Sequence, residues 1–176
     1  MKITRWAYLI SFLFFNFTSQ DKINKIFWSK NIPLQWKDFM GSPKQNQGFA
    51  AMTSYCIETA EEEGRVYINC SFDKKKSWRI KKKESENLLR HEQYHFNVAE
   101  VYARKMRKTV IDHNTRLGSK EFTKIFKRTL NECETAQKKY DKDTNHSIIF
   151  QEQTKWENNT DKQLEELSNF SNPLIY

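Results

Sequence analysis

The stretch His91-Glu92-Gln93-Tyr94-His95 places two histidines four residues apart, with a glutamate after the first. On a helix, residues four apart lie on one face, so both imidazoles can reach a single ion. Zinc accepts two imidazole nitrogens and a third protein ligand, keeps one position for water, and lowers the pKa of that water to about 7. The pattern predicts a zinc-dependent hydrolytic site, with His91 and His95 as metal ligands and Glu92 as the general base.

The residues around this pattern predict an amphipathic helix over residues 85–108. The two histidines and the glutamate fall within its apolar arc. The apolar side chains of that arc are Leu88, Leu89, Phe96, Val98, Ala99, Tyr102, Ala103 and Met106. Buried imidazoles and a buried carboxylate need partners, and one metal ion is a partner for all three. The competing interpretation is a fortuitous pair of core histidines.

A second helix is predicted over residues 119–140, with Ser119 as its N-cap. Apolar residues recur there at spacings of three and four: Phe122, Ile125, Phe126, Leu130, Cys133, Ala136 and Tyr140. The short turn at residues 112–118 makes the two helices antiparallel. Residues 140–146 should therefore return to the level of the histidine pattern.

This return offers Asp141, Asp143 and His146 as the third metal ligand. His146 is the predicted ligand, because a third neutral imidazole gives a three-histidine site of the kind known for hydrolytic zinc. Asp143 is the next choice, and carboxylates that do not bind the metal would orient the imidazoles. Tyr140 is predicted to steady the oxyanion during hydrolysis, and a plain core role is the alternative.

The first part of the chain predicts strands at residues 25–29, 49–59 and 65–72. The last two are joined by the acidic turn at residues 61–64, and residues 65–72 are the candidate edge strand for an extended substrate. Cys56 and Cys70 are equally far from Glu63, which predicts a disulfide between them. Cys133 is predicted to be a buried free thiol.

Residues 1–19 have the pattern of a signal peptide, because Lys2 and Arg5 precede an apolar run. That run is shorter than the roughly 20 residues that span a bilayer. We expect export to the periplasm or the medium, contact with the membrane only through this segment before cleavage, and one domain over residues 20–176. An uncleaved N-terminal anchor is the alternative. A short helix over residues 160–167 is expected in the tail.

The chain is basic, with a net charge of +8 over 176 residues. Residues 74–76 and 81–83 are all lysine, a composition that could favour an anionic partner but more often marks a solvated surface. No nucleic-acid-binding motif accompanies them. We expect a monomer that takes a peptide or protein substrate in the cell envelope and has no nucleic-acid partner.

Several separated motifs occur together in the order that one family shows. They consist of Leu34, Trp36, Asp38, Phe39 and Gly41, then Ala50, Ala51 and Thr53, then Phe72, Ser77 and Trp78, then residues 88–96 with Glu100 and Arg104, and finally Tyr140, Asp141, Asp143, Thr144 and His146. The chain resembles, over residues 25–156, the bacterial domain of unknown function 922, a family described as predicted secreted zinc-dependent proteases. The resemblance implies a zincin-like fold. The family usually shows Gly after the late histidine, where this chain has Ser147.

The sequence therefore predicts an α+β single domain of the zincin-like kind, with N-terminal strands and a hairpin packed on an antiparallel helix pair that carries the histidine pattern. The predicted function is that of a secreted or periplasmic zinc-dependent metallopeptidase, which hydrolyses peptide bonds through a zinc-activated water. Two alternatives stay open. One is a non-catalytic, metal-stabilised binding module of the envelope, and the other is an amidase that acts on cell-wall peptides.

Overall fold

The computed structural model describes residues 23–43 and 49–176. The predicted signal peptide at residues 1–19 lies outside these ranges. No helix within them combines the length and the apolar character that a membrane crossing requires.

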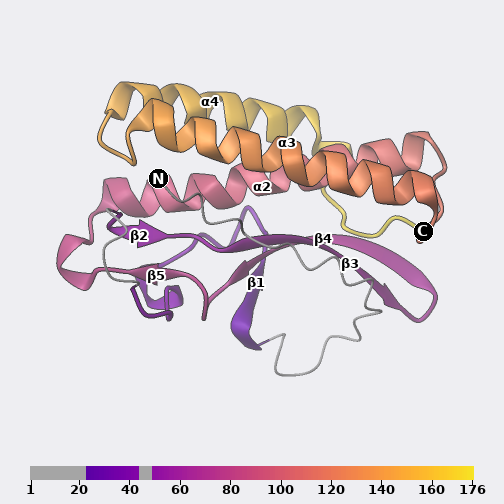
Figure 1. Ribbon diagram of the computed structural model, residues 1–176, viewed down its shortest axis with the longest axis horizontal. Helices are drawn as coiled ribbons and strands as arrows, with labels where there is room; N and C mark the ends of the chain where they lie inside the picture. The colour runs from indigo at the N-terminus through magenta and orange to yellow at the C-terminus, as the bar shows by residue number, and fades with distance from the viewer. Residues whose placement is uncertain (1–22, 44–48) are drawn as a thin grey trace, which may run out of the picture.

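Three long helices lie on one side of a small antiparallel sheet (Figure 1). The helices are α2 (Glu86–Asp112), α3 (Lys120–Thr144) and α4 (Phe150–Glu166). The strands are β1 (Lys25–Phe27), β2 (Ala51–Met52), β3 (Tyr55–Glu62), β4 (Arg65–Asp73) and β5 (Trp78–Arg79). The described residues also form three short 3-10 turns, which are η1 (Trp36–Asp38), η2 (Lys81–Lys83) and η3 (Ser168–Phe170). The α+β prediction is confirmed.

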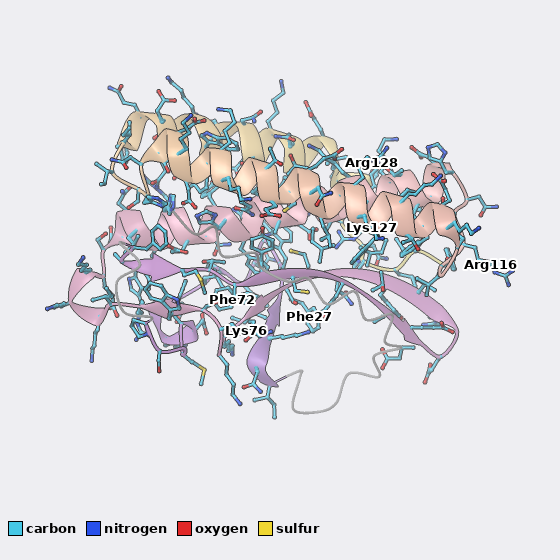
Figure 2. The ribbon with its side chains drawn as sticks, viewed as in Figure 1. Phe27, Phe72, Lys76, Arg116, Lys127 and Arg128 are labelled. Atoms are coloured by element: carbon cyan, nitrogen blue, oxygen red, sulfur yellow. The ribbon has the colours of Figure 1, made fainter. Side chains whose placement is uncertain are left out.

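The helix α2 is the central element of the molecule. It packs on β3 and β4, and α3 and α4 cover it from the other side (Figure 1). Ala99 and Ala103 are fully buried in the core with Phe96 and Met106, and small side chains at these positions let other elements approach α2 closely. Side chains fill the layer between sheet and helices, while Arg116 extends into solvent from the turn between α2 and α3 (Figure 2). Because α2 is packed on both sides, its rotation about its own axis is fixed, and so is the direction in which His91 and His95 point.

The strand β4 lies in the middle of its sheet, in the order β1-β4-β3. Its second neighbour is β1, whose Lys25 pairs with Asp73. Both sides of β4 are therefore paired near that end, and the expectation that residues 65–72 form an edge strand for substrate is wrong. On this side of β4, the three-residue strand β1 covers residues 71–73. The C-terminal residues cover the part near the hairpin, where the amides of Val66 and Ile68 donate to the carbonyl oxygens of Tyr176 and Pro173.

The three cysteines are free, so the predicted disulfide between Cys56 and Cys70 is wrong. The hairpin turns at Glu63 and Gly64, both with positive φ of 52° and 72°, as a two-residue turn requires. This turn pairs Cys56 with Ser71 and Ile57 with Cys70. The offset of one residue puts the two thiols on opposite faces of the hairpin, with Cys56 exposed and Cys70 buried. The buried thiol predicted at Cys133 is confirmed.

The predicted strand at residues 49–59 is two strands, because the chain changes sheets after β2. The strand β2 pairs only with β5 in a separate two-stranded sheet, where Ala51 faces Arg79. Gly41 bridges to Trp78 on the other side of β5. A Cβ at Gly41 would lie 2.6 Å from the carbonyl oxygen of Lys75, so only glycine permits this close approach. Within the described residues, β2 is thus the free edge of this small sheet.

The helix α4 is longer than expected, since residues 160–167 were the only helical part predicted in the tail. Its buried residues are Gln153, Glu157 and Thr160. Because these buried side chains are polar, the sequence does not show the repeat of apolar residues from which a helix is predicted. Gln153 bonds to Asn87 on α2, and Glu157 pairs with Arg90.

Candidate metal centre

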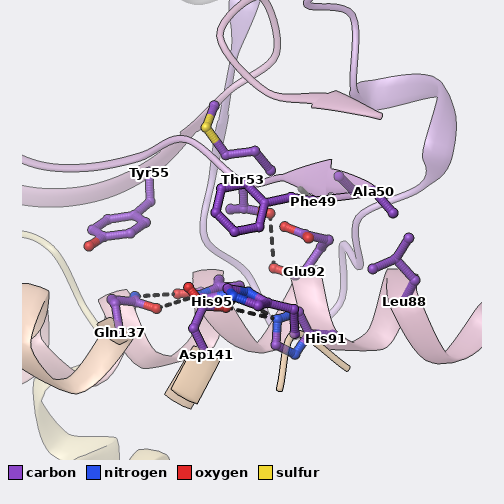
Figure 3. Close-up of a pocket in the computed structure, with 13 residues that line it drawn as sticks. Phe49, Ala50, Thr53, Tyr55, Leu88, His91, Glu92, His95, Gln137 and Asp141 are labelled. Carbon is purple, nitrogen blue, oxygen red and sulfur yellow. Dashed lines mark hydrogen bonds and ion pairs between the residues drawn. The ribbon is translucent and has the colours of Figure 1, made fainter. Parts of the chain in front are cut away.

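Two imidazoles and one carboxylate meet between α2 and α3. The Nε2 atoms of His91 and His95 lie 3.1 Å apart, and the Oδ1 atom of Asp141 lies 3.2 Å from the first and 3.1 Å from the second (Figure 3). These three residues form a group that could hold a metal ion. Ligands at about 2.1 Å from a tetrahedral zinc are roughly 3.4 Å apart, so small shifts would accommodate an ion.

The helix pair positions this group as the sequence predicted. His91 and His95 are one turn apart on α2. Because α3 runs antiparallel to α2, the last turn of α3 lies beside these histidines. Asp141 lies in that last turn and bonds to a histidine that is 50 positions earlier in the chain. The predicted return of residues 140–146 to the site is therefore seen in the structure.

His146 reaches the group through Asp141. Its Nδ1 atom lies 3.0 Å from Asp141 Oδ1, and its side chain lines the same pocket. Asp143, the second choice for the third ligand, is not brought to the group. Its Oδ2 atom accepts hydrogen bonds from Lys139 and from Nε1 of Trp156. The structure thus offers Asp141 as a ligand that the sequence ranked below His146.

The loop that carries His146 has an unusual backbone. Asn145, His146 and Ser147 all have positive φ, of 45°, 53° and 73°. Residues other than glycine adopt this region at a cost, and such strain persists where surrounding contacts hold it. The side chain of Asn87 on α2 donates to the carbonyl oxygen of Ser147 at 2.7 Å, and the His146 amide donates to Asp141. Glycine would adopt the φ of Ser147 without this cost.

Glu92 lies beside the histidines on the wall of the pocket. Its side chain is 3% exposed, and its Oε2 atom has no hydrogen-bond partner among the described residues. The hydroxyl of Thr53, just after β2, donates to the backbone oxygen of Glu92 at 3.1 Å and so ties β2 to this turn of α2. Burial raises the pKa of Glu92, which makes it a stronger proton acceptor than an exposed carboxylate.

Tyr140, on α3, contacts the rings of both histidines and is fully buried. Its ring stacks on His91 with the ring centres 4.5 Å apart, and its hydroxyl lies 3.4 Å from the backbone oxygen of His91. The hydroxyl thus contacts the backbone of α2, and Tyr140 is not among the residues that line the pocket. This placement agrees with the core alternative for Tyr140, whose ring packs against His91 and supports it.

The two imidazoles differ in their electrostatics. Burial lowers the pKa of His91 to about 4. Burial also opposes the charge of His95, but the hydrogen bond and the negative charge of Asp141 prevail and raise its pKa to about 9. Burial likewise opposes the charge of Asp141, yet hydrogen bonds from both histidines hold the pKa of Asp141 well below its usual range. An ionised aspartate at the centre favours a cation between the three groups.

The pocket above the group has a volume of about 180 Å³. One wall is the set of polar groups on α2 and α3, and the other is the chain around β2 (Figure 3). The apolar lining residues are Phe49, Ala50, Ala51, Met52, Tyr55 and Leu88. No lysine or arginine is among the described residues that line it. The apolar lining suits an uncharged part of a molecule next to the metal group, and no basic side chain among these lining residues would hold an anionic group.

Residues 65–147 match the family model of a bacterial protein of unknown function, DUF922. The match covers just under half of the chain and includes His91, His95, Asp141 and His146. It supports the resemblance inferred from the motifs, and the family description names no activity. No curated protein and no solved structure matches the chain.

Two functional candidates were missed or ranked low from sequence. Asp141 was treated as a residue that orients an imidazole, and Gln137 was not considered. Gln137 lies four residues after Cys133 and four before Asp141, so it continues the inward stripe of α3 with a polar side chain. A buried polar residue on an apolar stripe, one turn before a candidate ligand, is the signal that could have identified it.

Proposed function

We propose that this protein is a zinc-dependent metallopeptidase of the zincin type, acting in the cell envelope or the medium. One observation carries the proposal: Nε2 of His91, Nε2 of His95 and Oδ1 of Asp141 converge in a pocket that also contains Oε2 of Glu92, which has no hydrogen-bond partner in the described part of the chain. Two imidazoles and a carboxylate are a known donor set of hydrolytic zinc. When bound, the ion would supply a Lewis acid and a water of lowered pKa.

In this proposal, Glu92 takes the proton of the attacking water on its free Oε2 atom and later gives it to the leaving amine. Its raised pKa suits both steps, since the carboxylate must accept a proton and then release it. Thr53 and the helix hold Glu92 in place through its backbone. His91 and His95 hold the ion, and Asp141 is proposed as the third ligand in place of His146.

The strand β2 supports a peptide as the substrate. Residues 49–53 line the pocket, and β5 occupies only one side of β2. An extended peptide could pair with the other side, which would hold its backbone across the metal group. The apolar lining favours uncharged side chains next to the bond that is cut. The N-terminal segment read as a signal peptide is the basis for the proposed export.

A metal-stabilised binding module is the second candidate, and the position of His146 favours it. The imidazole of His146 lies 3.0 Å from Asp141 Oδ1, so it would become a fourth protein ligand if its ring turned toward the ion. Structural zinc sites have four protein ligands, whereas catalytic sites keep one position for water.

The test compares wild-type protein with Glu92→Gln, both loaded with zinc, in a screen of peptides that includes cell-wall peptides. Glu86→Gln, in the first turn of α2, is the matched control. We expect wild type and the control to cleave, and Glu92→Gln to keep its zinc but lose at least about 100-fold in rate. Full activity in Glu92→Gln would remove Glu92 from the mechanism. Wild type that binds zinc tightly and cleaves nothing would favour the binding module.

A further inference from the structure

The side chain of Gln137 contacts His95 at two points from the neighbouring helix α3. Its Oε1 atom lies 2.6 Å from Nδ1 of His95, and its Nε2 atom donates to the backbone oxygen of His95 at 2.8 Å (Figure 3). Gln137 is 6% exposed, so water does not compete freely for these bonds. The amide is thus held in one place and in one plane.

The second contact decides which way the amide points. A backbone carbonyl only accepts hydrogen bonds, so the atom of Gln137 that faces it must be the NH2 nitrogen. The amide oxygen then faces Nδ1 of His95, and an oxygen without hydrogen can only accept. Nδ1 of His95 must therefore carry the proton. The lone pair of the neutral ring is left on Nε2, which is the atom that faces His91 and Asp141.

We infer that Gln137 is a positioning residue, which fixes the tautomer and the ring plane of His95 so that Nε2 is ready for a metal ion. This inference rests on the proposed zinc centre. Groups that hold the far nitrogen of a metal-binding histidine typically account for about 10 to 100-fold in metal affinity. A neutral amide does so here without adding a third negative charge beside Asp141 and Glu92.

His91 has no comparable hydrogen-bond support. Its Nδ1 atom is buried and has no hydrogen-bond partner within the described parts of the chain. The ring is held by stacking on Tyr140 instead. Within the described residues, the hydrogen bond to the far ring nitrogen is therefore made to His95 and not to His91. Replacing Gln137 tests what that hydrogen bond does.

The experiment uses Gln137→Leu, which removes both contacts, and Gln137→Glu, which keeps an acceptor for Nδ1. Thr129→Val is the control, because Thr129 is buried on the same helix and does not line the pocket. Zinc affinity is measured by competition with a chelator. The tautomer of His95 is measured in the zinc-free protein from the nitrogen chemical shifts of the ring, at a pH above its pKa of about 9, because only the neutral ring has a tautomer.

We expect Gln137→Leu to bind zinc about 10 to 100-fold more weakly and to lose the single Nδ1–H tautomer of His95. Gln137→Glu should recover most of the affinity, and Thr129→Val should change neither readout. Wild-type affinity and tautomer in Gln137→Leu would overturn the inference, as would an equal loss in Thr129→Val. If Gln137→Leu does not fold, Gln137→Met carries the same expectations.

Neither readout depends on hydrolysis. A wild-type protein that binds zinc but cleaves no peptide would contradict the proposed function and leave the role of Gln137 intact. A wild-type protein without zinc affinity would contradict both. A zinc-binding wild type with a mixed His95 tautomer would contradict the role of Gln137 alone.

Discussion

Asp141 Oδ1 lies 3.0 Å from Nδ1 of His146, so the late histidine meets the metal group through the aspartate. The same oxygen faces Nε2 of both α2 histidines. One carboxylate oxygen thus stands where three imidazoles converge. We interpret Asp141 as the third ligand, and His146 as a residue that orients its carboxylate or closes the site.

Replacing each candidate ligand separates these roles. We expect Asp141→Ala to weaken zinc binding by far more than 100-fold, and His146→Ala to weaken it by about 10 to 100-fold, as for a residue that orients a ligand. Asp143→Ala is the control and should bind zinc normally, because its carboxylate bonds to Lys139 and Trp156. A larger loss in His146→Ala than in Asp141→Ala would restore His146 as the third ligand.

The cysteines give a prediction that does not depend on metal. Since Cys56 is exposed and Cys70 and Cys133 are buried, we expect Cys56 to be alkylated before the other two in the native protein, and all three to react after denaturation. The reaction of Cys56 should still be slow at neutral pH, because desolvation and the nearby Glu58 carboxylate raise the pKa of its thiol to about 11. Mass spectrometry after alkylation would assign the first modified site to Cys56. Only one reactive thiol in the denatured, unreduced protein would instead indicate a disulfide.

The buried ion cluster on α2 should matter for stability. Glu100 is 1% exposed and accepts from Arg104 at 2.9 Å and from Arg107 at 2.8 Å. Because Glu100→Ala leaves two buried guanidinium groups without their carboxylate, we expect the free energy of unfolding to fall by about 3–5 kcal/mol.

Urea unfolding measures this loss. Glu152→Ala removes the partner of exposed Lys155 and is the control, which should change stability by about 1 kcal/mol at most. Equal effects in the two variants would show that the cluster contributes no more than a surface pair.

Ser147→Gly tests the strained loop. A residue other than glycine in the left-handed region costs roughly 1–2 kcal/mol. Glycine removes this cost, but it also makes the unfolded chain more flexible, which offsets part of the benefit. We therefore expect the free energy of unfolding to rise by roughly 0.5–1 kcal/mol. Ser171→Gly is the control, because Ser171 has φ −71° and gains nothing from glycine. Thermal unfolding compares the two, and a loss of stability in Ser147→Gly would contradict the strain.

The parts of the fold that show a clear period could be predicted from the sequence. The spacing of apolar residues identified α2 and α3, and the two histidines and Glu92 fall on the buried side of α2 as expected. The acidic turn located the hairpin. It did not fix the pairing, because moving the turn centre by half a residue, from Glu63 to the Glu63–Gly64 bond, shifts the register by one residue and pairs Cys70 with Ile57 in place of Cys56.

Other features depend on contacts that no local pattern records. The helix α4 buries Gln153 and Glu157, so the residues on its buried face are as polar as those expected on an exposed face. The choice between Asp141 and His146 depends on a loop with three positive φ values, which directs the His146 ring at the carboxylate. The partner of His95 lies 42 positions away on α3, where only the packing of two helices brings it into contact.

The central claim is that the pocket between α2 and α3 is a zinc centre with Asp141 as its third ligand. An anomalous difference map at the zinc edge, from crystals of the zinc-loaded Glu92→Gln protein, tests it most directly. We expect one peak at about 2.0–2.2 Å from Nε2 of His91, Nε2 of His95 and Oδ1 of Asp141. No peak in this pocket, or a peak bound by His146 with Asp141 turned away, would contradict the claim.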